Sequence, residues 1–434
     1  MSRLHDALEE LSHDAPRPTP HPELWHHGRR LRRRDRIVSA GLVLVMVLLV
    51  GGLATLVTGP PVRVGPAGDV VPEGAVPVAI EDVPDHVTEP TDSDLVVGPV
   101  SVAFVSGNDL PVVVGATDGR YRVLDLPGWQ DDSVLAVSPS GQRLAWLSAT
   151  GRQSLDPALS VLTTATGQVQ TTRLVLGAGL RPSAASWSPD GTRIAWLGDL
   201  AGSRGSGGGA VFGVVEVADT LTETPANPSQ RGLVGVAVAE DGSLALGTQS
   251  GGLLLDADTR DPRLLPRTDG FPGHFSPSGD VLALETRVPA QESSTVQVAT
   301  GKQWRHAFPA DTFDASTSRP VGWLDDRLQL LLVTSEEDLA SELVVTTPEV
   351  EATSTWRSDI GTVDPVAASS LTVAVDLLPD PDASSTQDLT HDFGGPDWPM
   401  SAETRSGLMV GGGLLLAALL LTAYVLWRRT RRLG

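Results

Sequence analysis

The sequence contains no cysteine. Disulfide bonds, thiolate catalysis, Cys-ligated zinc and iron–sulfur clusters are therefore excluded. Lysine occurs only once, as Lys302, and aromatic residues make up 4% of the chain. With 434 residues, of which 41% are hydrophobic, the chain can still bury a sizeable core. Any exported domain must be stable through side-chain packing alone.

The net charge of -21 is unevenly distributed along the chain. Residues 1–36 contain eight arginines and six acidic residues, and the last seven residues contain four arginines and no acid. Both ends are therefore basic, and the segment between them is strongly acidic. Because an acidic domain repels a phosphate backbone, we expect no nucleic acid among the partners of this segment.

Two uncharged apolar runs lie at residues 37–58 and 407–427. Each is long enough to cross roughly 30 Å of hydrocarbon as a helix, so we predict two transmembrane α-helices. Arginine clusters precede the first run and follow the second. Such clusters stay in the cytoplasm, which predicts a two-pass protein of the cell membrane with both termini cytoplasmic. A cleaved signal peptide is the alternative for the first run, but the run is longer than about 15 residues and has no A-x-A-like site.

The spans divide the chain into seven predicted parts. These are a basic cytoplasmic head (1–36), the first span (37–58), a Pro-rich acidic stalk (59–94), an extracytoplasmic domain (95–379), an acidic linker (380–406), the second span (407–427) and a basic cytoplasmic tail (428–434). The composition of the stalk and of the linker predicts extended, solvated chain. Within the stalk, "AVPVAIEDV" also has the pattern of a strand that could join the fold.

The extracytoplasmic domain contains an internal repeat. The sequence "WSPDGTRIAWL" (187–197) recurs in looser form at 137–147, 238–248 and 275–285, and a degenerate copy lies at 323–333. The turn glycines of the first four copies are 50, 51 and 37 residues apart. In the copies at 137–147, 187–197 and 275–285 Pro presets its φ angle, and in all of the first four copies Asp or Ser favours the turn and Gly takes the position with positive φ. The alternating strand that follows predicts a hairpin with one buried face.

A second β-rich pair follows most of the hairpins, so each repeat predicts one four-stranded blade of an all-β domain. Weaker copies begin at Val102 and Pro365, which gives a β-propeller of six or seven blades. A closed ring brings its first and last strands together, commonly in one blade completed from both ends. Two linkers that leave the same rim can then reach the same bilayer.

The repeat resembles the WD40-like (PD40) repeats of TolB-type propellers. The resemblance is strongest at Ser188–Trp196 and partial at Ser138–Trp146 and Ser276–Leu284. It implies a propeller used as a binding platform. The layout as a whole also resembles membrane-anchored actinobacterial proteins with an Arg-rich head and a short basic tail.

Several sequence features suggest catalysis but do not complete a motif. Asp190 and Gly191 are adjacent, so the S-x-D-x-G-x-x-W spacing of a sialidase Asp-box fails, and we interpret Asp190 as a turn residue and Trp196 as a core residue. No G-x-S-x-G pentapeptide occurs, and the Gly-rich segment 201–210 lacks the Lys-Ser/Thr ending of a phosphate loop. The remaining candidates are scattered metal ligands: His86, His274, His306 and His391, and the acidic group Asp256, Asp258 and Asp261. We therefore predict no catalytic, cofactor-binding or metal-binding residue, and no enzyme.

Two short segments point to interactions at or in the membrane. In the head, Leu4, Leu8 and Leu11 follow helical spacing, which predicts either a membrane-surface helix or a docking helix for a cytoplasmic regulator. In the second span, Gly407 and Gly411 form a G-x-x-x-G pattern that allows helices to approach closely.

The features together predict a membrane-anchored, non-catalytic module of the bacterial envelope that binds an extracytoplasmic protein or small ligand. The alternative is a transmembrane sensor that couples an envelope signal to a cytoplasmic partner, such as a sigma factor, through residues 1–36.

Overall fold

The computed structural model describes most of the predicted extracytoplasmic domain. The described residues are 71–398, with gaps at 73, 149–156, 175–178, 201–208, 219, 225–231, 249–250, 258–261, 266–269, 287–291, 308–315, 338, 348–356 and 380–386, together with 401, 413 and 417–429. The predicted head (1–36), the first predicted span (37–58) and both glycines of the G-x-x-x-G pattern lie outside them, and residues 417–429 of the C-terminal segment are helical. Within the described residues, no helix has the length and apolar character needed to cross a bilayer.

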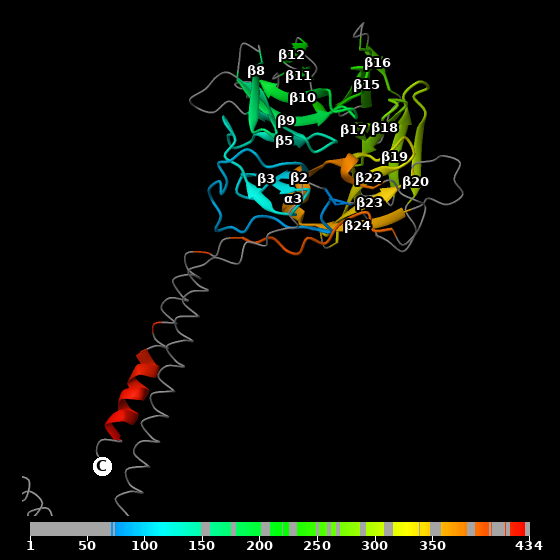
Figure 1. The fold of residues 1–434 in the computed structure, drawn as a ribbon. Coiled ribbons are helices and arrows are strands. Elements are labelled where there is room, and N and C mark those ends of the chain that lie inside the picture. The colour runs from blue at the N-terminus through cyan, green and yellow to red at the C-terminus, as the bar shows by residue number, and fades with distance from the viewer. Residues whose placement is uncertain are drawn as a thin grey trace, which may run out of the picture. The chain divides into compact units, whose positions relative to one another are not determined.

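Six β-sheets make up the domain (Figure 1). Blade 1 contains β25 (Thr372–Val373), β2 (Val100–Val105), β3 (Pro111–Gly115) and β4 (Tyr121–Val123). Blade 2 contains β5 (Val134–Val137), β6 (Arg143–Ser148), β7 (Ala158–Thr163) and β8 (Gln168–Arg173). Blade 3 contains β9 (Leu180–Trp187), β10 (Arg193–Leu200), β11 (Ala210–Val217) and β12 (Leu221–Thr224). Blade 4 contains β13 (Leu233–Val238), β14 (Leu244–Thr248), β15 (Gly251–Leu255) and β16 (Pro262–Leu264). Blade 5 contains β17 (Phe271–Phe275), β18 (Val281–Glu285), β19 (Glu292–Gln297) and β20 (Gln303–Ala307). Blade 6 contains β21 (Ser316–Trp323), β22 (Gln329–Ser335), β23 (Ser341–Thr346), β24 (Arg357–Val363) and β1 (Ala79–Ile80).

The blades form a ring because their first strands contact one another in succession. Strands β5, β9, β13, β17 and β21 pack in this order, and β25 contacts both β21 and β5 to close the ring. The predicted β-propeller is confirmed, and it has six blades. The sequence allowed a seventh because the weak copies at Val102 and Pro365 were counted separately, whereas the structure joins them in blade 1.

The S-P-x-G hairpins have the geometry that their residues predict. In blade 3 the Gly191 N–H donates to the Ser188 carbonyl oxygen (2.9 Å), and Gly191 has φ +66°. The Ser188 hydroxyl accepts a bond from the Arg193 N–H (2.9 Å) and holds the first residue of β10 against the turn. The turns at 138–141 and 276–279 repeat both bonds. The repeat is therefore a unit that joins the first two strands of a blade.

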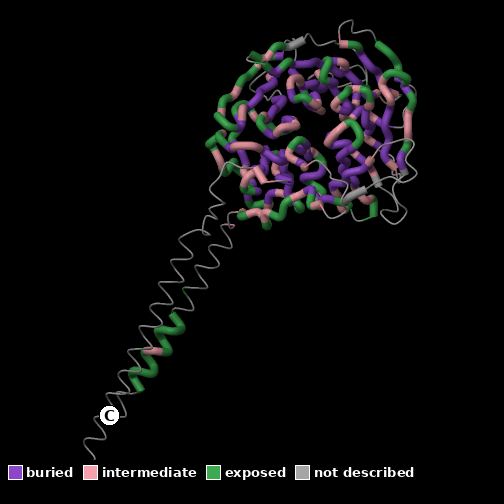
Figure 2. Tube along the Cα trace, turned by 45° about the vertical axis from the view of Figure 1, so that its right-hand side comes forward, coloured by how far each residue is buried: buried purple, intermediate pink, exposed green. Residues whose placement is uncertain are grey.

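Burial of the second strand differs from the sequence prediction of one buried face. In β10, Ile194 and Trp196 pack with residues of blade 2, and Ala195 and Leu197 pack with residues of blade 4. Both faces are buried because each blade of a ring is stacked between two neighbours. Figure 2 shows this as a buried interior with exposed residues along the outer edge.

Both ends of the described domain contribute to ring closure. Strand β25 pairs antiparallel with β2, with Val373 opposite Val102. The Thr372 hydroxyl donates to the Ala103 carbonyl oxygen (3.2 Å) and accepts from the Val137 N–H in blade 2 (3.1 Å). This confirms the expectation of one blade completed from both ends. Strand β1 adds a second closure, because it pairs parallel with β24 at the outer edge of blade 6.

The folded domain is larger than the predicted range of 95–379. Ile80 and Val83 of the predicted stalk and Leu389 of the predicted linker are buried in the same core cluster. The Val78 N–H donates to the His391 carbonyl oxygen (3.1 Å), and the His391 N–H donates to the Val76 carbonyl oxygen (2.8 Å). Proline and acidic residues made both segments look solvated, but their spaced aliphatic residues pack on the propeller. The alternative that "AVPVAIEDV" contributes a strand is the correct one.

Candidate binding site in the central channel

A cavity of about 220 Å³ lies between the first strands of the blades. Its wall comes from β5, β9, β17, β21 and β25, and from the 3-10 helix η1 (Val375–Leu377) that follows β25. We call this cavity the channel. Because five blades contribute to it, its shape depends on the whole ring.

One end of the channel is formed by the repeat turns, and we call it the turn end. Pro139, Pro189 and Pro277, the prolines of three S-P-x-G turns, line it. Trp187 and Trp323 stand just before the turns of blades 3 and 6, and each joins its blade to the preceding one. The Trp187 Nε1 donates to the Ala136 carbonyl oxygen, and the Trp323 Nε1 donates to the His274 carbonyl oxygen (both 3.1 Å).

The opposite end lies beside the short helix α3 (Pro365–Ser370), and we call it the helix end. Arg319 lines the channel from β21, and its Nη2 donates to the Ala368 carbonyl oxygen of α3 (2.6 Å). Along the chain, strand β25 lies between α3 and η1. In η1, the Asp376 N–H donates a hydrogen bond to the Pro139 carbonyl oxygen of a repeat turn (3.0 Å). Arg319 therefore reaches the helix end, and Asp376 lies at the turn end.

The enclosure of the channel shifts the pKa values of its titratable groups. His274 is half-buried and lines the channel. Desolvation, together with the positive charge of Arg319, lowers the pKa of His274 to about 4, so the imidazole is neutral at pH 7. Burial also lowers the pKa of Arg319, an effect that the charge of Glu285 opposes. The guanidinium nevertheless stays protonated. Desolvation raises the pKa of Asp376.

The channel can therefore supply one permanent cation and a neutral imidazole. Ser186 adds a hydroxyl group, because it lines the channel, is 7% exposed, and has no hydrogen-bond partner among the described residues for its Oγ. The apolar part of the wall includes Val321, Val373 and Phe275. Such a set of groups suits binding and orientation of a small polar molecule.

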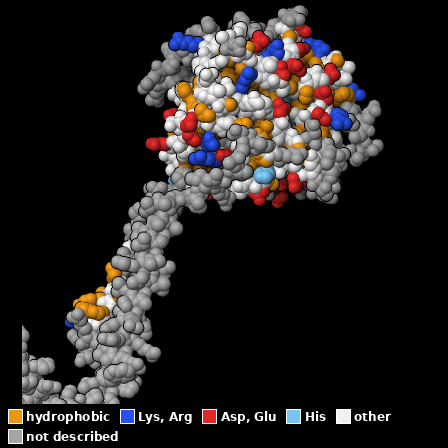
Figure 3. All heavy atoms as spheres, viewed as in Figure 1, with side chains coloured by type: hydrophobic (Ala, Val, Ile, Leu, Met, Phe, Trp, Pro, Cys, Tyr) orange, Lys and Arg blue, Asp and Glu red, His pale blue; other side chains and the backbone are white. Residues whose placement is uncertain are grey.

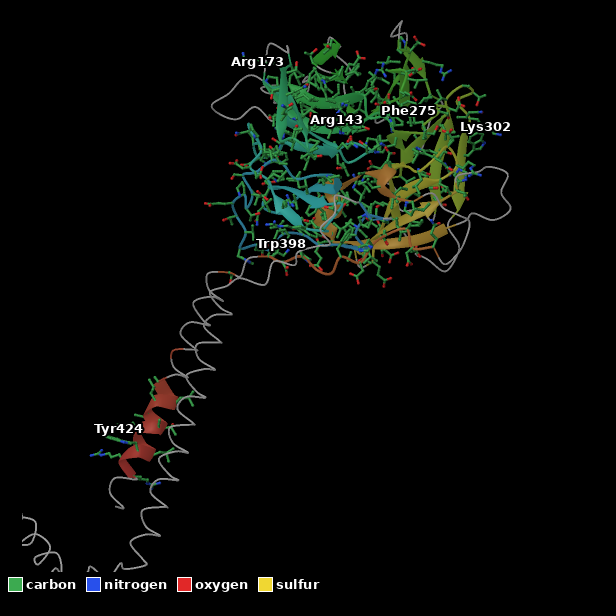
Figure 4. All side chains as sticks on the ribbon, in the orientation of Figure 1. Arg143, Arg173, Phe275, Lys302, Trp398 and Tyr424 are labelled. Carbon is green, nitrogen blue, oxygen red and sulfur yellow. The ribbon has the colours of Figure 1, made fainter. Side chains whose placement is uncertain are left out.

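A second cavity, of about 660 Å³, lies between the repeat turns of blades 4 and 5. Arg143 of blade 2 and Arg193 of blade 3 donate to the carbonyl oxygens of Gly191 and Glu240, each in the next blade. Leu244 is the corresponding first residue of β14, so blade 4 makes no such contact at this position. Figure 4 shows Arg143 and Phe275 toward the middle of the propeller, whereas Arg173 and Lys302 lie at its outer edge.

The structure places Asp190 and Trp196 as the sequence analysis interpreted them. Asp190 accepts hydrogen bonds from the Ser188 hydroxyl (2.5 Å), the Thr192 N–H (3.1 Å) and the Thr192 hydroxyl (2.6 Å). Burial tends to raise the pKa of Asp190, but these bonds and the charge of Arg193 lower it overall. Trp196 is fully buried. Neither side chain belongs to the channel wall.

We expect Asp190→Ala to lower the free energy of unfolding by about 1 kcal/mol, because it removes three hydrogen bonds from an exposed turn. The matched control is Ser140→Ala in the blade 2 turn, where the Ser140 hydroxyl makes only a long contact of 3.4 Å with Ser138. Urea unfolding of both variants measures the difference. Equal effects of the two substitutions would show that the Asp190 hydrogen bonds do not stabilise the turn.

The other sequence candidates do not meet at one site. His274 lines the channel, His306 is buried in β20, where its Nε2 contacts the Thr295 Oγ1 (3.2 Å), and His391 pairs with the β1 segment. Asp256 lines the second cavity, whereas Asp258, Asp261 and most of segment 201–210 lie outside the described residues. In the described part of the chain, no three His, Asp or Glu side chains are grouped to hold a metal ion.

Arg319 was not identified by sequence reasoning. The feature of the sequence that could have indicated it is a single charged residue within "STSRPVGW", the first strand of the degenerate fifth repeat. Detecting it would require knowing that the first strand of each blade lines the channel. On the face of the propeller drawn in Figure 3, by contrast, acidic and basic side chains are interspersed among the described residues.

No family model matches the sequence, and no curated protein matches it. Solved structures similar to this chain include the periplasmic gluconolactonase of Pseudomonas aeruginosa (15% identity, 60% of this chain and 83% of that chain, TM-score 0.39). A TolB-like protein from Agrobacterium tumefaciens has 13% identity, with 62% of this chain and 96% of that chain covered, and a TM-score of 0.39. An acylaminoacyl peptidase from Pyrococcus horikoshii has 10% identity, with 58% and 41% covered, and a TM-score of 0.38.

Proposed function

We propose that this chain is a non-catalytic binding protein that a membrane anchor holds outside the cytoplasm and whose propeller receives its ligand in the central channel. The channel carries the proposal, since five blades together enclose about 220 Å³ that contains a charged and a neutral polar side chain. Enclosed pockets with a few polar groups in an apolar wall are typical of ligand sites.

Two observations support the membrane anchor. The backbone bonds between the Val76–Val78 segment and His391 bring the chain leading from residues 37–58 close to the chain leading to residues 407–427. Two anchors whose connecting segments leave the propeller at neighbouring positions can enter the same bilayer. In the helical residues 417–429, the large apolar side chains Leu420, Leu421 and Leu426 are exposed, which suits contact with lipid.

The binding role is tested by filling the channel. Ala185 lines the channel in β9, and Ala185→Phe should occupy part of the space. The control is Ala165→Phe, in an exposed turn between β7 and β8. A panel of small polar molecules is screened against the full-length protein by ligand-detected NMR. We expect bound molecules to be lost in Ala185→Phe and retained in Ala165→Phe, and the proposal fails if filling the channel displaces none of them.

The second candidate is a sensor that signals to a cytoplasmic regulator, such as a sigma factor. The spacing of Leu4, Leu8 and Leu11 in the basic head favours it, because one apolar face on a short helix can dock on a partner. A pull-down with residues 1–36 should then recover the regulator. Recovery equal to that of a scrambled peptide would remove this candidate.

A further inference from the structure

Arg319 is a partly buried cation with few partners among the described residues. Its guanidinium group has five N–H donors, and between described residues it makes one hydrogen bond, to the Ala368 carbonyl oxygen. A carbonyl oxygen is a neutral acceptor, so this bond compensates for only a small part of the free-energy cost of removing the guanidinium charge from water. Glu285, at the end of β18, attracts the charge, but the described hydrogen bonds include none between the two side chains. Donor capacity therefore remains on the channel side of Arg319.

Two uncharged groups share this wall. His274 has a ring that is neutral at pH 7, because both enclosure and Arg319 disfavour its protonation, and one of its ring nitrogens therefore carries a proton to donate. The Ser186 hydroxyl is buried and unpartnered among the described residues. Both residues line the same cavity as Arg319. Three residues with hydrogen-bond donors, from three different blades, thus line one enclosed space, and no described carboxylate occupies the helix end of its wall.

We propose that the channel binds a small monocarboxylate, with the carboxylate at Arg319 and the apolar body of the molecule toward the turn end. The inference rests on the proposed role of the channel as the ligand site. A carboxylate is a planar acceptor that matches the fork of a guanidinium group. It also supplies the counter-charge that the neutral Ala368 carbonyl cannot.

Charge and size limit the ligand to this class. Glu285 already offsets part of the Arg319 charge, so a dianion such as phosphate would bring more negative charge than the site can balance. Asp376 at the turn end repels a second carboxylate and fixes the orientation of the first. The volume of about 220 Å³ is below the roughly 300–1,000 Å³ of pockets for drug-sized ligands. The wall residues Val321, Val373 and Phe275 suit a short apolar body.

The test uses matched pairs of molecules that differ only in charge. Butanoate and phenylacetate are compared with butanamide and phenylacetamide, and inorganic phosphate is included. Binding to the full-length protein in an uncharged detergent is measured by isothermal titration. We expect at least one carboxylate to bind at least tenfold more tightly than its amide, and more tightly than phosphate. This comparison needs no variant, so a folding defect cannot obscure it.

Substitutions then test whether Arg319 supplies the positive charge that binds the carboxylate. Arg319→Gln should weaken carboxylate binding at least tenfold and leave amide binding unchanged, and Arg319→Lys should weaken it less. The control is Arg263→Gln, because Arg263 lines the second cavity and, among the described residues, donates to the Val298 and Ala299 carbonyl oxygens. Thermal unfolding checks that each variant is folded.

The outcomes separate this inference from the proposed function. If amides or phosphate bind as tightly as carboxylates and Ala185→Phe displaces them, the channel remains the ligand site and the inference is wrong. If carboxylates bind but Arg263→Gln weakens them as much as Arg319→Gln, the inference is also wrong. If Ala185→Phe displaces nothing that binds, both the inference and the proposed function fail.

Discussion

Trp146→Ala is expected to lower the free energy of unfolding of the propeller by about 3–5 kcal/mol, which is the usual cost of removing a large aromatic side chain from a core. Trp146 is fully buried in β6. It packs with Leu135 and Leu144 of its own blade and with Val113 and Ala374 of blade 1. The cavity left by alanine would thus open between two blades. Urea unfolding monitored by far-UV circular dichroism measures the change.

A matched pair of phenylalanine variants separates the hydrogen bond from the packing. The Trp146 Nε1 donates to the Pro127 carbonyl oxygen (3.1 Å), whereas the Trp196 Nε1 is buried without a partner among the described residues. Trp146→Phe loses a bond and leaves the Pro127 acceptor unpaired, but Trp196→Phe removes an unpaired donor. We expect Trp146→Phe to cost about 1–3 kcal/mol more than Trp196→Phe. Equal costs would show that the Pro127 hydrogen bond contributes no net stability.

The local parts of the fold could be predicted because their causes are local. The S-P-x-G turns depend on the φ preference of Pro, on short side-chain bonds such as that from the Arg193 N–H to Ser188, and on the positive φ of Gly191. All of these lie within six residues of one another. Repetition of the turns at blade-length intervals then indicated a propeller.

Closure of one blade from both ends was expected for any closed ring, but other features that depend on contacts between distant segments could not be predicted. The number of blades is set by the pairing of Val373 with Val102, which joins two weak repeats at opposite ends of the domain. The burial of Ile80 and Leu389 depends on a surface that blades 1 and 6 form together. Their own neighbours in the sequence are prolines and acids, so local composition gave the wrong expectation for them.

The same distinction applies to the channel. His274 was noted in the sequence as one of several scattered histidines, and Arg319 was not noted at all. The two residues are 45 positions apart, and only the ring brings β17 and β21 together at one cavity. Ser186 directly precedes the best-preserved repeat, but its hydroxyl is notable only because it has no hydrogen-bond partner among the described residues. The proposed ligand site therefore depends on residues at which the repeats differ, and only the assembled ring brings them together.

Stability should depend on pH through His274. Its pKa falls from 6.5 to about 4 on folding, because enclosure and the charge of Arg319 disfavour the imidazolium form. Between these two values the unfolded chain binds a proton that the folded chain does not. The contribution of His274 is therefore fully present above about pH 6.5 and is lost progressively as the pH falls toward 4, by at most about 3 kcal/mol.

The measurement is the difference in free energy of unfolding between the wild type and His274→Gln, taken from urea unfolding at intervals from pH 7 to pH 4. Asp376, whose raised pKa gives stability that is lost as the pH rises, is present in both proteins and cancels in the difference. We expect the wild type to lose stability relative to His274→Gln as the pH is lowered. His306→Gln serves as the second histidine control, since burial also lowers the pKa of His306 but no cation adds to the effect. A difference that stays constant between pH 7 and pH 4 would mean that His274 is protonated as readily in the channel as in the unfolded chain. Arg319 would then not exert its charge on the space that the proposed ligand occupies.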